Sequence, residues 1–115
     1  MTFPLHVRMT DVPDVGGVHR AIDRASVRVA CFADAIDGCE VVVWAERRPG
    51  ARSRFGVQIY LAAFGRDFFV NRAPAEEDFG ASLEAAFEQL RWELDGWWRA
   101  PRRRSRSLPG STIDA

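Results

Sequence analysis

A stretch of helical periodicity near the end of this 115-residue chain constrains its fold more than any other feature. Apolar residues recur there three or four positions apart, as on one face of an α-helix. They are Phe79, Leu83, Ala86, Phe87, Leu90, Leu94 and Trp97. Glu76, Glu77 and Asp78 load its first turn with negative charge and Pro101 ends it, which predicts a helix over about residues 76–98. Such a helix must bury its apolar face against a second layer.

An earlier segment shows the same periodicity and predicts a helix over about residues 14–32. Its apolar positions are Val15, Val18, Ile22, Ala25, Val29 and Phe32. Asp37-Gly38 is a stop signal a few residues further on. The helix therefore also needs an apolar surface to cover.

Four segments predict strands: residues 3–10, 40–47, 55–63 and 68–70. Pro4 lacks an N–H, which places the first strand at a sheet edge. Residues 46–54 predict a polar loop, and Gly65-Arg66 predicts a two-residue hairpin turn.

The order of elements is therefore β-α-β-β-β-α. It predicts an α/β (α+β) two-layer sandwich, a four-stranded mixed sheet with two helices packed on one face. Residues 1–98 form a single domain in this interpretation, and residues 99–115 form an Arg-rich disordered tail. The uncovered sheet face would carry Tyr60 and Phe64 with Trp44 or Val42, a surface through which the chain could form a homodimer.

Composition excludes several classes of protein. With 47% hydrophobic and 28% charged residues, the chain is typical of globular proteins. No stretch of 18 apolar residues exists, so neither a membrane span nor a membrane partner is expected. Two cysteines, Cys31 and Cys39, are too few for a disulfide framework, which favours reduced thiols and a cytoplasmic location.

Catalytic motifs are lacking in the sequence. The two histidines, His6 and His19, lie on different predicted elements and have no metal-ligand spacing, and no nucleotide-binding or nucleophile motif occurs. Most carboxylates crowd the last helix, where a solvated acidic face explains them. We therefore expect a binding protein and not an enzyme, with no cofactor, no metal and no small-molecule substrate.

Arginine placement gives the best functional indication. All sixteen basic residues are Arg, and residues 99–115 hold five Arg against one Asp. Clustered arginines are typical of surfaces that bind nucleic-acid phosphates, although ordinary solvated faces and loops also carry them. The candidate RNA-binding residues are Arg20, Arg24 and Arg28 on the first helix, Arg47, Arg48, Arg52 and Arg54 between two strands, and Arg91, Arg99, Arg102, Arg103 and Arg104.

Some aromatic side chains fall outside the predicted core. Trp92 and Trp98 lie away from the apolar face of the last helix, and Tyr60 points to the open face of the sheet. Exposed aromatic rings beside arginines are typical of contact surfaces that stack on bases or associate with a second copy. These three residues are the candidate interaction residues.

Several local motifs lie in the same order as in a known family. They are the run Asp78-Phe79-Gly80-Ala81-Ser82-Leu83-Glu84-Ala85-Ala86-Phe87-Glu88-Gln89-Leu90, the strand Leu5-His6-Val7-Arg8, and Val41-Val42-Val43 followed by an Arg-rich loop and Val57-Gln58-Ile59-Tyr60-Leu61. Over about residues 3–98 the sequence resembles the ribosome hibernation-promoting factor family, which includes the ribosome-associated inhibitor A and sigma-modulation proteins.

The resemblance implies a ribosome-associated protein of the stress response that regulates translation. In that family the domain binds the small ribosomal subunit in the decoding channel, using basic residues on both helices. This chain departs from the pattern, because the predicted last helix has seven acidic residues and Arg91 as its one basic residue. Two hypotheses follow: a hibernation-type protein that docks on small-subunit ribosomal RNA, or a protein-interaction module on the same fold.

Overall fold

The computed structural model describes residues 3–100 of the chain. Its elements are β1 (Leu5–Thr10), α1 (Val15–Ala25), the 3₁₀-helix η1 (Ser26–Ala35), β2 (Ile36–Arg48), β3 (Ala51–Ala63), β4 (Arg66–Glu76) and α2 (Phe79–Arg99). The order β-α-β-β-β-α predicted from the sequence is confirmed. The predictions made for residues 101–115 lie outside the described residues.

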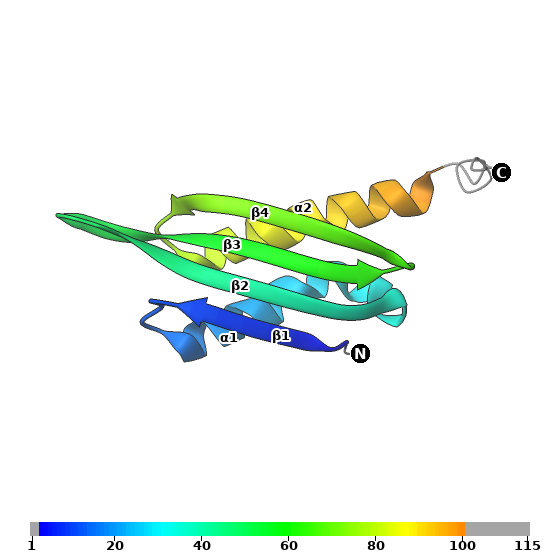
Figure 1. Ribbon diagram of the computed structural model, residues 1–115, viewed down its shortest axis with the longest axis horizontal. Helices are drawn as coiled ribbons and strands as arrows, with labels where there is room; N and C mark the ends of the chain where they lie inside the picture. Colours follow the sequence, from blue (N-terminus) through cyan, green and yellow to red (C-terminus); the bar gives the residue numbers. More distant parts are fainter. Residues whose placement is uncertain (1–2, 101–115) are drawn as a thin grey trace.

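The four strands form one sheet in the order β1-β2-β3-β4. β1 pairs with β2 in parallel, and the other two pairs are antiparallel. The sheet is therefore mixed, as predicted, because α1 and η1 carry the chain back to start β2 beside β1. Figure 1 shows both helices on one side of this sheet, so the opposite face has no helix over it.

The core lies between the sheet and the helices. Alternate residues of each strand point toward the helices, and α2 covers the β3–β4 side of the sheet with the fully buried Leu83, Phe87, Leu90 and Leu94. α1 adds Val18 and Ile22. Truncating one of these buried leucines to alanine costs about 2–5 kcal/mol in proteins of this kind.

The first helix is shorter than predicted, since its α-helical part ends at Ala25 and continues as η1 to Ala35. The Ser26 hydroxyl donates a hydrogen bond to the Asp23 carbonyl oxygen at 3.0 Å, a local bond that competes with helix geometry. Val27 and Val29 are β-branched and add to the cost of further α-helix.

The predicted polar loop at residues 46–54 is wrong, because most of it is strand. β2 runs to Arg48 and β3 begins at Ala51, so a long β-hairpin replaces the loop. Cross-strand pairing continues to Arg48 and Ala51 with a register shift just before the tip. Gly50 has a φ of 69°, which the tight turn requires. We call residues 45–55 the arm.

The β3–β4 turn is also displaced by one residue from the prediction. It is formed by Phe64 and Gly65, which both have positive φ, as a type I′ turn requires. The Phe64 ring stacks on Trp97, with 4.6 Å between ring centroids, and packs edge-on against Phe32. The predicted place of Phe64 on the open sheet face is therefore wrong, because these contacts hold its ring on the helix side.

α2 begins three residues later than predicted. Glu76 is the last residue of β4, and Asp78 is the N-cap, whose carboxylate accepts a hydrogen bond from the Gly80 N–H at 3.0 Å. In the first turn, the Ser82 hydroxyl donates to the Phe55 carbonyl oxygen at 3.1 Å. This contact ties the start of α2 to the base of the arm.

Candidate nucleic-acid interface

The arginines predicted as one row on the first helix divide into two groups. Arg28 lies beyond the α-helical part and turns toward α2, where its Nε is 2.6 Å from Glu84 Oε1 and its Nη1 pairs with Glu88. Within residues 3–100, Arg20 and Arg24 are exposed and take part in no ion pair. Two of the three charges are therefore available to an external ligand.

A second arginine completes this junction between the helices. Arg91 on α2 donates to the Arg28 carbonyl oxygen at 2.9 Å, and its Nε is 2.9 Å from Asp95 Oδ2. The hydrogen bond that Arg28 donates to Glu84 is the main reason that the pKa of Arg28 is raised, and the hydrogen bond that Arg91 donates to Asp95 raises the pKa of Arg91 in the same way. Both guanidinium groups therefore have carboxylate partners within the fold, and Arg91 is not placed as a free phosphate ligand.

The four arginines predicted between two strands all lie on the arm. Arg47, Arg48 and Arg52 are exposed, and Arg54 is half-buried. The one carboxylate between residues 45 and 55 is Glu46, whose Oε1 lies 3.9 Å from Arg48 Nη1. The Nε of Arg54 is buried and has no hydrogen-bond partner in the described structure. Four arginines therefore share one glutamate, and the arm has a formal charge of +3.

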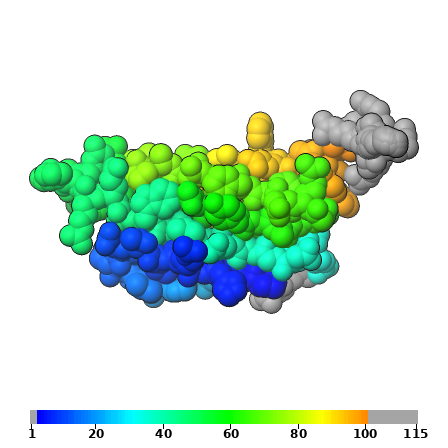
Figure 2. All heavy atoms as spheres, in the orientation of Figure 1, coloured from blue at the N-terminus to red at the C-terminus, as the bar shows by residue number. Residues whose placement is uncertain are grey.

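The position of the arm makes these charges accessible. Figures 1 and 2 show the β2–β3 hairpin projecting beyond the helices and the other strands at one end of the molecule. α1 and α2 both begin toward this end, since Asp14 follows β1 and Phe79 packs against Phe55 with ring centroids 5.6 Å apart. The exposed arginines of the arm, together with Arg20 and Arg24 of α1, are the predicted RNA-binding residues whose charges the fold leaves accessible.

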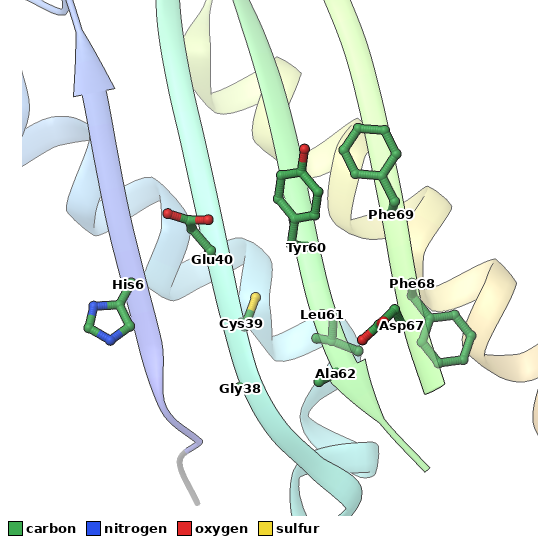
Figure 3. Close-up of a pocket in the computed structure, with 10 residues that line it drawn as sticks. All are labelled: His6, Gly38, Cys39, Glu40, Tyr60, Leu61, Ala62, Asp67, Phe68 and Phe69. Carbon is green, nitrogen blue, oxygen red and sulfur yellow. The ribbon is translucent and has the colours of Figure 1, made fainter. Parts of the chain in front are cut away.

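Aromatic side chains lie on the uncovered face of the sheet. Tyr60 on β3 and Phe69 on β4 are 47% and 45% exposed, with ring centroids 4.6 Å apart. Figure 3 shows these rings side by side at a shallow hollow of about 640 Å³, with His6 and Glu40 on the neighbouring strands. Glu40 accepts a hydrogen bond from Arg8 at 3.1 Å. Sequence reasoning identified Tyr60 and missed Phe69, although the alternation that buries Phe68 indicates it.

The two tryptophans predicted as contact residues differ in their surroundings. Trp92 on α2 is the more exposed, at 76%, and lies beside Gln89 and Glu88 of the same helix and Arg72 of β4. Trp98 is 50% exposed and stacks on Phe64 with ring centroids 5.6 Å apart. Trp98 and Arg99 line a hollow of about 530 Å³ with Cys31, Asp34 and Asp95. Arg102, Arg103 and Arg104 lie outside the described residues.

Residues 3–100 contain no group of three or more His, Cys, Asp or Glu side chains arranged to hold a metal ion. No helix in this part of the chain is both long and apolar enough to cross a membrane.

Comparison with known proteins gives a likeness in structure. A ribosomal subunit interface protein from Coxiella burnetii superposes with a TM-score of 0.63 at 14% identity, covering 81% of this chain and 97% of the other. The N-terminal domain of Protein Y from Thermus thermophilus superposes with a TM-score of 0.62 at 14% identity, covering 84% and 99%. No protein-family profile and no curated protein matches the sequence.

The chain has the fold of these two proteins. Both are members of the hibernation-promoting factor family, so the resemblance of fold found in the sequence is confirmed. At this level of identity the likeness concerns the fold, and the surface residues must be considered on their own chemistry.

Proposed function

We propose that this chain is a ribosome-associated, non-enzymatic binding protein that docks on RNA of the small ribosomal subunit and thereby modulates or silences translation. The observation that carries the proposal is the shared fold, which spans more than four fifths of this chain and nearly all of each neighbour. One of these neighbours is a ribosomal subunit interface protein.

The arm and two exposed arginines of α1, Arg20 and Arg24, would make the RNA contact. Arg47, Arg48 and Arg52 are exposed, and Arg20 and Arg24 carry no ion pair in the described structure. Exposed guanidinium groups bind phosphate oxygens in a bidentate manner and release counterions when they do so. These five side chains would bind phosphates, and the paired arginines Arg28 and Arg91 between the helices are not needed for this contact.

The face of α2 is unsuited to the same contact. Glu84 and Glu88 are already paired with Arg28, and Arg91 is paired with Asp95. A phosphate there would compete with carboxylates for two arginines whose charges are compensated. The proposed docking surface is therefore shifted from the helix pair toward the arm.

The test is co-sedimentation with small ribosomal subunits at low and high salt. One variant combines Arg20→Ala and Arg24→Ala, and a second combines Arg47→Ala, Arg48→Ala and Arg52→Ala. The control combines Arg8→Ala and Arg66→Ala, which removes two arginines from outside the proposed surface. We expect salt-sensitive binding that both surface variants weaken and the control retains.

Two results would contradict the proposal. The first is absence of the full chain from the subunit fraction at low salt. The second is equal loss of binding in the control and in the Arg20/Arg24 variant, because the effect would then follow net charge and not position. A chain ending at residue 100, compared with the full chain, measures what Arg102, Arg103 and Arg104 contribute.

A second candidate function is a protein-interaction module that forms a homodimer. It is favoured by the exposed Tyr60–Phe69 pair on the uncovered sheet face. Light scattering coupled to size-exclusion chromatography measures the mass of the wild type and of a Tyr60→Ser/Phe69→Ser variant. A dimer that becomes a monomer in the variant supports this function, and a monomeric wild type excludes it.

A further inference from the structure

Trp44 occupies an unusual place on the open face of the sheet. It lies on β2 directly opposite Gly56 on β3, and its indole ring covers that glycine. A Cβ at position 56 would lie 2.3 Å from Cζ2 and 2.4 Å from Cε2 of the ring. The indole therefore packs one side against the β3 backbone. The side chain is half-buried and belongs to the face that no helix covers.

The Trp44 ring lies next to the basic arm. Four residues separate Trp44 from Arg48 near the tip, which is about 13 Å along a strand. On the neighbouring strand, Arg54 is two residues from Gly56 on the same face, and its Nε has no hydrogen-bond partner in the described structure. An aromatic platform and a cluster of guanidinium groups are thus within reach of one short ligand.

We propose that Trp44 and the arm form a site for single-stranded RNA, in which one unpaired base stacks on the Trp44 indole and the arm arginines bind the flanking phosphates. The combination of a stacking ring and a basic track is what single strands need. A duplex does not fit, because its bases are already stacked on each other and their faces are closed to a side chain.

The charge of the surroundings distinguishes this site from the Tyr60–Phe69 pair further along the same face. Glu40 and Asp67 line the hollow at those rings, whereas the arm beside Trp44 carries +3. A phosphate is therefore attracted to the Trp44 end of the face, whereas at the other end Asp67 is acidic and Glu40 is already paired with Arg8. A protein partner with an apolar surface would favour that other end.

The inference deepens the proposed function, since it names unpaired RNA as the feature that the arm recognises. Oligonucleotide binding and subunit co-sedimentation are nevertheless separate measurements. Subunit binding by a chain whose oligouridine binding does not depend on Trp44 would leave the proposed function intact and remove the inference. Oligonucleotide binding through Trp44 without subunit binding would do the reverse.

The experiment measures fluorescence anisotropy of a labelled oligouridine of about 12 nucleotides, a length within the range that small single-strand sites occupy. An abasic oligonucleotide of the same length and charge serves as the second probe, and an RNA duplex as the third. The protein variants are Trp44→Leu and Trp44→Phe. The control is Trp92→Leu, which removes a more exposed indole from α2.

We expect oligouridine to bind about tenfold more tightly than the abasic probe, a modest value for one stacked base. Trp44→Leu should abolish that difference, Trp44→Phe should retain most of it, and Trp92→Leu should leave it unchanged. Circular dichroism of each variant establishes that it is folded. Equal binding of oligouridine and the abasic probe by the wild type, or a duplex bound as tightly as oligouridine, overturns the inference.

Discussion

Arginines on the arm and arginines at the helix–helix junction have the same chemistry and opposite situations. Arg28 and Arg91 each contact a carboxylate of α2, and Arg91 also donates to the Arg28 backbone. On the arm, four arginines share Glu46. The first group closes the space between two packed elements, while the second projects on a hairpin that only β2 and β3 form.

This difference shows that an exposed arginine is available to a ligand only when no carboxylate of the fold is already bound to it. Arg28 is 43% exposed, close to the 41% of Arg48, yet two glutamates bind Arg28 at hydrogen-bond distance, whereas Glu46 Oε1 lies 3.9 Å from Arg48 Nη1. Two neighbouring α-helices bring side chains from both into reach of each other, whereas a two-stranded hairpin has fewer neighbours. The predictions below test whether this contrast governs binding and stability.

The largest effect is expected from the arm. Combining Arg47→Ala, Arg48→Ala and Arg52→Ala should weaken oligouridine binding about 100-fold at low salt and reduce the slope of log K against log[salt] by about 2. Anisotropy titrations at several salt concentrations give both quantities. An Arg28→Ala/Arg91→Ala variant should change neither by a comparable amount, and an equal loss in both variants would remove the contrast between the regions.

Gly56→Ala tests the geometry that connects the arm to the sheet. The added methyl group must displace the Trp44 ring, which should destabilise the fold by about 1–3 kcal/mol. Urea unfolding followed by fluorescence measures the loss, and near-ultraviolet circular dichroism reports the moved indole. Gly38→Ala is the control, because a Cβ there meets no atom within 4 Å. Equal stability of the two variants would contradict the packing of Trp44 on Gly56.

The two cysteines allow a second comparison of surroundings, because Cys31 is exposed and Cys39 is buried. Burial, followed by the charge of Glu40, raises the pKa of Cys39 to about 12 from 9.0. Between about pH 9 and 12 the Cys39 thiol therefore keeps its proton in the folded state and loses it in the unfolded state. The free energy of unfolding falls over this range and is not affected by this thiol at lower pH.

At pH 10 the loss should be about 1 kcal/mol. Unfolding of the wild type and of Cys39→Ala at pH 8 and pH 10 measures it, because the variant lacks this part of the pH dependence. At pH 8 in the folded protein, a thiol reagent should modify the exposed Cys31 much faster than the buried Cys39. Rapid modification of both thiols would contradict the burial of Cys39.

The smallest effect should come from freeing the junction arginine. Glu84→Gln combined with Glu88→Gln leaves Arg28 without its carboxylate partners, so the salt dependence of RNA binding should steepen by about 0.7 per added phosphate contact. The matched control is Asp34→Asn/Asp37→Asn, which removes the same charge from two exposed positions away from the arm and outside the Arg28 ion pairs. An equal change in the control would show that net charge, and not release of Arg28, alters binding.

Much of the fold was accessible from periodicity. The apolar spacing of α2 and the alternation in β1 and β3 depend on which side chains face the core, and that is a local property of the chain. The side of the sheet on which Phe64 lies was predicted wrongly, because a distant contact decides it. Phe64 is held on the helix side by Trp97 and Trp98, which lie more than thirty positions away.

The candidate site was accessible only as a list of residue types. The sequence indicated the arginines of the arm and of the first helix without showing which of them have partners. It also placed Trp44 on a strand without indicating the glycine beneath it, because Gly56 meets Trp44 through strand register. The spacing of residues along the sequence does not show which residues face each other across two strands.

By itself, the sequence determined the order of the elements, the two layers and the residue types that give the surface its chemistry, because periodicity and composition act along the chain. Only the tertiary structure decided which charges are free. The packing of η1 against α2 pairs Arg28 with glutamates, and the pairing of β2 with β3 extends an arm on which the arginines outnumber the carboxylates. Electrostatic availability depends on distances between elements, and the fold sets those distances.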